Sequence, residues 1–132
     1  MRLTELVHHT LNDHLREGDL AIDATAGNGH DTGYLATCVG ESGKVIAIDI
    51  QDSAIESTRS LLSEKALLDR VTLLLGDHSA ILEQLLEKYK ESVATVVFNL
   101  GYLPGSDKSV KTEAANTIQA LEVSAMLLRH SG

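Results

Sequence analysis

Hydrophobic and polar positions alternate in blocks along this chain. Four short stretches are rich in Val, Ile and Leu, and the last three are almost continuously apolar: 19–24, 44–50, 71–75 and 93–100. Runs of this kind are typical of parallel strands that are covered on both faces. The pattern therefore predicts four buried strands.

Segments with helical spacing lie between and around these strands. Apolar residues recur every three or four positions in five segments, namely 2–16, 30–39, 53–68, 79–90 and 113–130. Gly18 and Gly40 mark the ends of the first two. Because strands and helices alternate, we predict a single α/β domain over residues 1–132, with an open parallel sheet and helices on both of its faces.

Composition limits the classes of function. The first 22 residues carry charges and three histidines, so they match neither a signal peptide nor a membrane span, and we expect a cytoplasmic protein with no membrane partner. The single cysteine, Cys38, cannot form an internal disulfide, and we interpret it as a small core residue. A net charge of −8 argues against an autonomous nucleic-acid binder, but it allows an enzyme that touches RNA through a local basic patch.

A glycine-rich stretch follows the first strand, with the sequence DATAGNGHDT at residues 23–32. In an open parallel sheet, ligands bind outside the carboxyl ends of the strands. Gly27 and Gly29 would let the backbone turn tightly there and approach a ligand closely. A plain tight connection between strand and helix is the alternative.

Acidic residues end the next two strands. Asp49 follows Gly29 by 49 − 29 = 20 residues, the offset of an acid that accepts hydrogen bonds from ribose hydroxyls. Asp77 could accept from an adenine amino group, and His78 could pack beside the ring. The alternative for Asp77 is a cap of the helix over 79–90.

The fourth strand runs into the polar loop NLGYLPGSDKS at residues 99–109. Four strand ends with polar, ligand-suited residues predict a nucleotide-type site. Thr32 stands where the dinucleotide fingerprint needs a third glycine, and no P-loop motif is present, so S-adenosylmethionine fits better than NAD. His30 and His78 lack the spacing of zinc ligands, and we predict no metal.

These motifs resemble those of a known family. DATAGNGHDT, AIDIQ, GDH and NLGYLPG, with Thr112, Thr117, Ile118, Ala120 and Leu121 downstream, resemble the class I S-adenosylmethionine-dependent methyltransferases described as putative rRNA methylases of the YtqB type. Members of that family are linked to methylation of the tRNA wobble uridine and are also called MnmM. The resemblance covers nearly the whole chain and implies a Rossmann-like class I methyltransferase fold.

The resemblance also implies roles for individual residues. The cofactor, S-adenosylmethionine, would contact the glycine-rich stretch and the ends of the second and third strands, through Thr25, Ala26, Gly27, Asn28, Gly29, Asp49, Gln51, Asp77 and His78. The loop Asn99–Gly105 stands where many such enzymes have a substrate loop. We predict catalytic roles for Asn99 and Tyr102, and substrate contacts from Leu100, Gly101, Pro104, Lys108 and Thr112.

The implied function is methylation of RNA, with tRNA favoured over rRNA, on the aminomethyl group of a modified wobble uridine. The side-chain carbonyl of Asn99 or a nearby backbone carbonyl would accept a hydrogen bond from the amine, and Tyr102 would stack on the base; Asn99 could instead simply terminate its strand. Phosphate contacts would come from Lys108, Lys111, Arg2, Arg16 and the histidines of the first helix, unless these form a solvated face. Alternatives are a non-catalytic S-adenosylmethionine-binding module, a small-molecule methyltransferase and, less favoured, an NAD-dependent oxidoreductase.

The chain departs from the family pattern in length. Class I methyltransferase sheets have seven strands, and strands five to seven have no counterpart in these 132 residues. With strand order 3-2-1-4, the segment 93–100 would be an unprotected edge. We therefore expect a truncated domain, or an edge completed by a partner chain such as a second copy in a homodimer.

Overall fold

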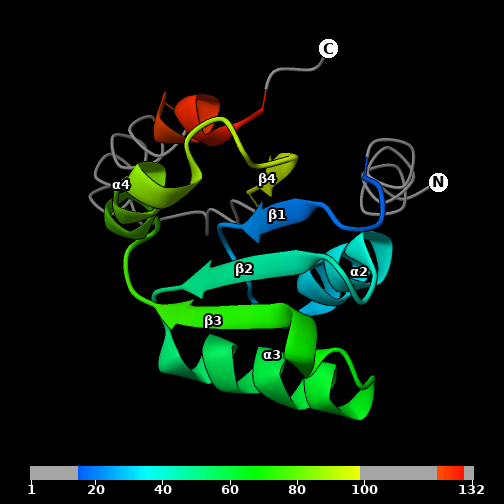
Figure 1. Cartoon of the computed structure of the whole chain (residues 1–132). Helices are drawn as coiled ribbons and strands as arrows, with labels where there is room; N and C mark the ends of the chain where they lie inside the picture. Colours follow the sequence, from blue (N-terminus) through cyan, green and yellow to red (C-terminus); the bar gives the residue numbers. More distant parts are fainter. Residues whose placement is uncertain (1–14, 99–121, 130–132) are drawn as a thin grey trace, which may run out of the picture.

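The computed structural model describes residues 15–98 and 122–129, in which strands and helices alternate (Figure 1). The elements are β1 (Leu20–Asp23), α2 (His30–Val39), β2 (Lys44–Asp49), α3 (Asp52–Glu64), the 3-10 turn η1 (Leu68–Arg70), β3 (Val71–Leu75), α4 (His78–Tyr89) and β4 (Thr95–Val97). Residues 122–127 are also helical. The predicted helix over 2–16 lies outside the described residues except for Leu15 and Arg16, which are not helical.

All four strands are parallel and follow the order β3-β2-β1-β4, which confirms the predicted sheet. Asp23 at the end of β1 lies opposite Ala47 of β2 and Val97 of β4. Asp49 at the end of β2 lies opposite Leu75 of β3. The carboxyl ends of the strands therefore meet at one edge of the sheet.

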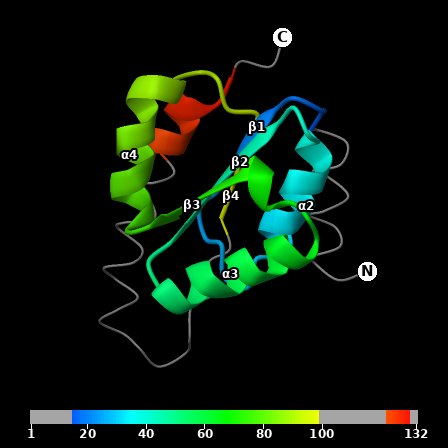
Figure 2. The same cartoon turned by 60° about the horizontal axis from the view of Figure 1, so that its bottom comes forward.

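Helices cover both faces of the sheet, as predicted (Figure 2). Helices α2 and α3 enclose one core cluster, which consists of Leu15, Ala21, Leu35, Ala36, Val39, Val45, Leu62, Leu67 and Ala94. Helix α4 and the helical segment 122–127 enclose the other, which consists of Ile22, Ala24, Ile46, Ile48, Leu82, Val93, Val123 and Leu127. Cys38 is half-buried and packs against the first cluster.

Helix α3 is shorter than the predicted segment 53–68. It ends at Glu64, and Ala66 adopts a left-handed conformation with φ 57°. The backbone N–H of Lys65 bonds to Leu61, and that of Leu67 bonds to Leu62, which closes the last turn. The prediction failed there because Leu67 and Leu68 extend the apolar pattern although the chain has already turned towards η1.

The fourth strand is also shorter than the predicted segment 93–100. Val93 lies outside β4 and forms an isolated parallel bridge with Leu128. The Val93 N–H bonds to the Leu127 carbonyl (3.0 Å), and the Arg129 N–H bonds to the Val93 carbonyl (2.8 Å). Two expectations are corrected here. The helix predicted over 113–130 ends at residue 127. The segment 93–100 was expected to be an unprotected edge, but Val93 is covered because the chain returns to it at Leu128 after that helix.

Candidate functional site

A tight glycine turn connects β1 to α2 at the carboxyl edge of the sheet. The Ala26 N–H bonds to the Ile48 carbonyl of β2 (2.8 Å), and the Gly29 N–H bonds to the Ala26 carbonyl (2.9 Å). Gly29 has φ 92°, and a Cβ atom built on it would lie 2.9 Å from Cα of Thr58. The turn therefore needs glycine at position 29, both for the backbone conformation and for the close approach of α3.

The peptide groups of Gly27 are held from two neighbouring elements. Its N–H donates to Oδ2 of Asp49 (3.0 Å), and its carbonyl accepts from Oγ1 of Thr58 (3.2 Å). A Cβ atom at Gly27 would meet nothing within 4 Å. Hydrogen bonds from Asp49 of β2 and Thr58 of α3 thus hold the turn in place, and open space remains beside Gly27.

Asp49 organises the end of β2. Its Oδ1 accepts from the Gln51 N–H (2.9 Å), so each carboxylate oxygen has one backbone partner and capacity for a further hydrogen bond. The next residue, Ile50, is 69% exposed. The Gly76 N–H at the end of β3 bonds to the Asp49 carbonyl (2.9 Å), which joins the two strand ends. The carboxyl edge of the sheet therefore carries an acidic residue, Asp49, followed directly by an exposed apolar residue, Ile50.

Asp23 is fully buried at the end of β1, a feature that the sequence reasoning did not single out. Its Oδ2 accepts from Oγ1 of Thr32 (2.7 Å), and its Oδ1 accepts from the Thr25 N–H (3.1 Å). Burial raises the pKa of Asp23 from its usual 3.8 to about 7, the two hydrogen bonds lower it, and the charges of Asp31 and Asp49 raise it. An aspartate that ends an apolar strand, with a threonine in the first turn of the next helix, was the available signal.

Asp77 is the N-cap of α4, the alternative that the sequence left open. Its Oδ2 accepts from the Ala80 N–H (3.1 Å) and from Oγ of Ser79 (2.6 Å). These bonds account for its place before the helix. Contact of Asp77 with an adenine amino group remains a prediction.

His78 reaches from the start of α4 to the end of β4. Its ring packs edge-on against Phe98, with centroids 5.8 Å apart and planes at 81°. Among the described residues, Nε2 of His78 and Oγ1 of Thr25 are buried without a hydrogen-bond partner. Both unpartnered atoms belong to predicted cofactor-binding residues, and buried polar atoms of this kind suit a ligand.

The structure brings together most of the predicted cofactor-binding residues. The stretch 25–29 is linked to Asp49 by the hydrogen bond of Gly27, and Gln51 follows on the exposed surface. Arg16 is exposed. The remaining predicted residues lie outside the described part of the chain: Asn99, Leu100, Gly101, Tyr102, Pro104, Lys108, Lys111, Thr112 and Arg2.

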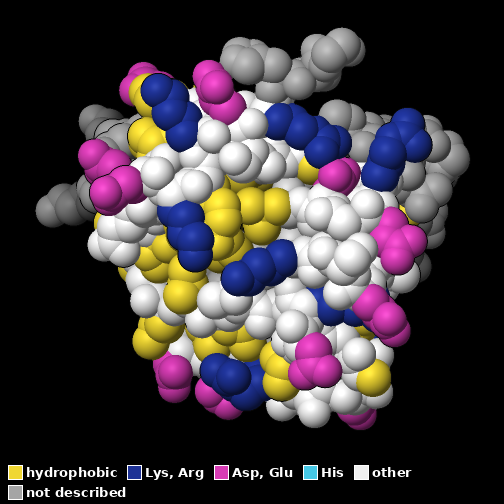
Figure 3. Space-filling view, in the orientation of Figure 1, with side chains coloured by type: hydrophobic (Ala, Val, Ile, Leu, Met, Phe, Trp, Pro, Cys, Tyr) yellow, Lys and Arg dark blue, Asp and Glu magenta, His cyan; other side chains and the backbone are white. Residues whose placement is uncertain are grey.

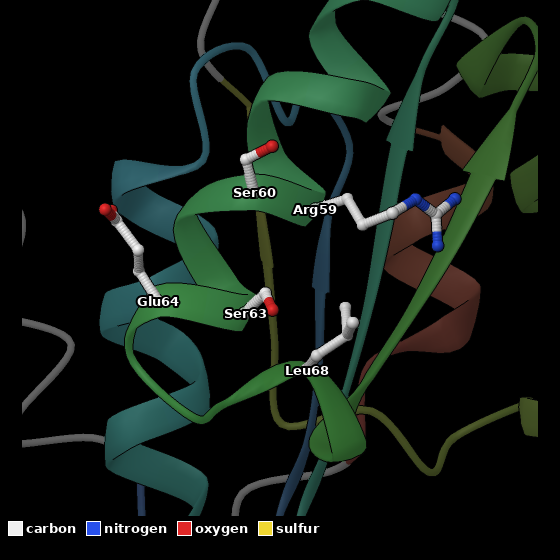
Figure 4. Close-up of a pocket in the computed structure, with 5 residues that line it drawn as sticks. All are labelled: Arg59, Ser60, Ser63, Glu64 and Leu68. Carbon is white, nitrogen blue, oxygen red and sulfur yellow. The ribbon is translucent and has the colours of Figure 1, made fainter.

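Other surfaces lie away from this edge. A hollow of about 440 Å³ runs along α3 and η1 and is lined by Arg59, Ser60, Ser63, Glu64 and Leu68 (Figure 4). Hydrophobic side chains gather between α4 and the strands β2 and β3 (Figure 3). Within residues 15–98 and 122–129, no cluster of three metal-binding side chains occurs, and none of the helices is both long and apolar enough to cross a membrane.

Several known proteins are similar to this chain in sequence and fold. A chloroplastic "tRNA (mnm(5)s(2)U34)-methyltransferase" of Arabidopsis thaliana is 39% identical over 139 residues, which is 99% of this chain and 50% of that protein. A crystal structure described as a "putative rRNA-methylase" from Clostridium thermocellum is 42% identical with a TM-score of 0.84. This chain aligns over its whole length to 69% of that one.

A second solved structure, described as a "putative methyltransferase" from Streptococcus mutans in complex with SAH, is 37% identical with a TM-score of 0.79 and again covers 100% of this chain and 69% of that one. The chain thus spans half the length of the Arabidopsis relative. It has the Rossmann-like methyltransferase fold of these neighbours. A sequence model of the family described as "Putative rRNA methylase" matches residues 45–132, which is more than half of the chain, and this chain belongs to that family.

Proposed function

We propose that this protein is an S-adenosylmethionine-dependent RNA methyltransferase whose acceptor is the aminomethyl group of a modified tRNA wobble uridine. The observation that carries the proposal is 39% identity, over almost the whole chain, to a tRNA (mnm(5)s(2)U34)-methyltransferase. The glycine turn at the carboxyl edge of the sheet supports it, since ligands of open α/β sheets bind there.

The charges at the site favour a cationic cofactor. The negative charges of Asp31 and Asp49 raise the pKa of Asp23, so these two carboxylates lie near the end of β1. The sulfonium and amino groups of S-adenosylmethionine are positive, whereas the pyrophosphate of NAD is negative and would be repelled. The Gly27 N–H is already bonded to Asp49, so it does not serve a phosphate. The site therefore fits S-adenosylmethionine better than a dinucleotide.

Each residue of the site has a role in this proposal. Asp49 accepts hydrogen bonds from the ribose hydroxyls while its backbone partners hold it in place. Ile50, which the sequence reasoning had not included, supplies an exposed apolar surface for the adenine ring, and Gln51 and His78 offer polar atoms to its edge. Residues 25–29 border the methionine part of the cofactor, where Gly27 leaves space.

The reaction demands little acid or base strength from the protein. Bound S-adenosylmethionine would supply a methyl group on a positively charged sulfur. The acceptor amine must be uncharged when it attacks, so it first gives its proton to solvent water, and the secondary amine formed by transfer releases its extra proton to water as well. We propose that the side-chain carbonyl of Asn99 accepts a hydrogen bond from the neutral amine and orients it. Tyr102 would stack on the uridine, so the protein acts chiefly by holding the two reactants in line.

The first test is a calorimetric titration of the purified protein with S-adenosylmethionine and, separately, with NAD. Asp49→Ala should weaken binding of S-adenosylmethionine by at least about tenfold, because it removes the ribose acceptors and the partner of the Gly27 N–H. Asp69→Ala removes the same charge from an exposed position in η1 and serves as the matched control. Binding of NAD alone would overturn the proposal.

The second test is transfer of a labelled methyl group to tRNA that carries a 5-aminomethyl wobble uridine. Transfer to this tRNA, and not to the same tRNA with an unmodified uridine, is the expected result. Cofactor binding without transfer would favour a non-catalytic module. Transfer to the free nucleoside at the same rate would favour a small-molecule enzyme.

A further inference from the structure

Thr58 has no place in the proposed chemistry, yet it is completely buried in the middle of α3. It lies 31 residues from Gly27 along the chain and donates a hydrogen bond from Oγ1 to the Gly27 carbonyl (3.2 Å). Burying a polar side chain costs free energy unless the side chain makes such a hydrogen bond. The hydroxyl is therefore used to hold the glycine turn.

The same side of α3 also limits where Gly29 can lie. A Cβ atom on Gly29 would stand 2.9 Å from Cα, 3.1 Å from Oγ1 and 3.2 Å from Cβ of Thr58. The turn thus rests directly on Thr58, through a hydrogen bond at Gly27 and through close packing at Gly29. Asp49 accepts the other hydrogen bond of Gly27, from its backbone N–H.

We propose that Thr58 is a positioning residue, which holds the Gly27–Gly29 turn in the conformation that accepts the methionine part of the cofactor. The proposal rests on the function proposed above, because it assigns the turn to S-adenosylmethionine. Glycines at φ 57° and 92° have many other accessible conformations. If the turn leaves its binding conformation for part of the time, the apparent affinity falls by that fraction.

The test compares two variants of the whole protein with the wild type. Thr58→Val keeps the shape of the side chain and removes the hydroxyl, whereas Thr58→Ser keeps the hydroxyl and removes a methyl group. We expect Thr58→Val to weaken S-adenosylmethionine binding by about 3- to 10-fold, the effect of one lost hydrogen bond, and Thr58→Ser to stay within about twofold of the wild type. If Thr58→Val does not fold, Thr58→Ala, which removes the hydroxyl and adds no new group, takes its place.

If Thr58 had a purely structural role, Thr58→Val would lower the melting temperature but would not bind S-adenosylmethionine more weakly than Thr58→Ser. Steady-state assays should show a KM for S-adenosylmethionine raised in Thr58→Val with kcat unchanged, and restored in Thr58→Ser. Amide exchange of Gly27 in the ligand-free protein should quicken in Thr58→Val alone. Equal affinity, KM and exchange in Thr58→Val and the wild type would overturn the role of Thr58. A wild-type protein that does not bind S-adenosylmethionine would instead refute the function on which it rests.

Discussion

Oγ1 of Thr32 lies 2.7 Å from Oδ2 of Asp23, and both side chains are fully buried. This bond ties the first turn of α2 to the end of β1, beneath the glycine turn. Thr32→Val should destabilise the fold by about 1–3 kcal/mol, since it leaves the buried Oδ2 of Asp23 without its donor. Thr32→Ser keeps the donor and should cost less. Urea unfolding of the two variants measures the difference, and equal losses would contradict the assignment.

Stability should depend on pH through Asp23. Its pKa is raised from 3.8 to about 7, so the folded protein keeps a proton there over a range in which the unfolded chain has lost it. The contribution is fully present below about pH 4 and is lost as pH rises to about 7, an effect on the order of 2–4 kcal/mol. Denaturant unfolding from pH 5 to pH 8 should show the wild type losing stability relative to Asp23→Asn. Parallel curves would show that Asp23 does not titrate in this range.

Two glycines in one turn should respond differently to alanine. Gly29→Ala places a Cβ against the backbone of Thr58 and should cost about 3 kcal/mol or more. Gly27→Ala meets open space and should cost about 1 kcal/mol for its left-handed backbone. The added methyl at position 27 should nevertheless weaken cofactor binding by tenfold or more. Thermal unfolding and calorimetry separate the two effects, and similar stability losses would argue against the described turn.

Substitutions of Asp77 can separate helix capping from cofactor contact. Asp77→Ala should cost about 1 kcal/mol because the Ala80 N–H loses its acceptor. Asp77→Ser preserves a good N-cap and should restore most of that stability. If Asp77 also contacts adenine, Asp77→Ser should still bind S-adenosylmethionine more weakly than the wild type. Wild-type affinity in Asp77→Ser would limit this residue to capping.

Arg129 and Asp19 connect the segment after the helical residues 122–127 to the start of β1. Nη1 lies 2.7 Å from Oδ1, and Nη2 lies 3.2 Å from Oδ2. Because the guanidinium is exposed to solvent, Arg129→Met should cost no more than about 1 kcal/mol, and the loss should shrink in high salt. Unfolding at low and high salt measures it. A loss of several kcal/mol would contradict the small contribution expected of a solvent-exposed ion pair.

Much of the fold follows from local patterns. The apolar runs predicted all four strands, the family resemblance supplied their order, and β3 and α2 have the predicted bounds. Boundaries failed where tertiary contacts overrode the pattern: Val93 pairs with Leu128 instead of extending β4. For the site, the glycines and Asp49 were recognisable because their spacing reflects a connection within one βαβ unit.

The sequence by itself determined the alternation of strands and helices, the glycine turn and the acids that end the strands, since periodicity and backbone freedom are local properties. Only the tertiary structure decided that Asp49 and Thr58 hold Gly27 from two sides and that Asp23 is buried against Thr32. These contacts join residues 9 to 31 positions apart. Their geometry depends on how α2 and α3 pack against the sheet, which a periodic pattern does not specify.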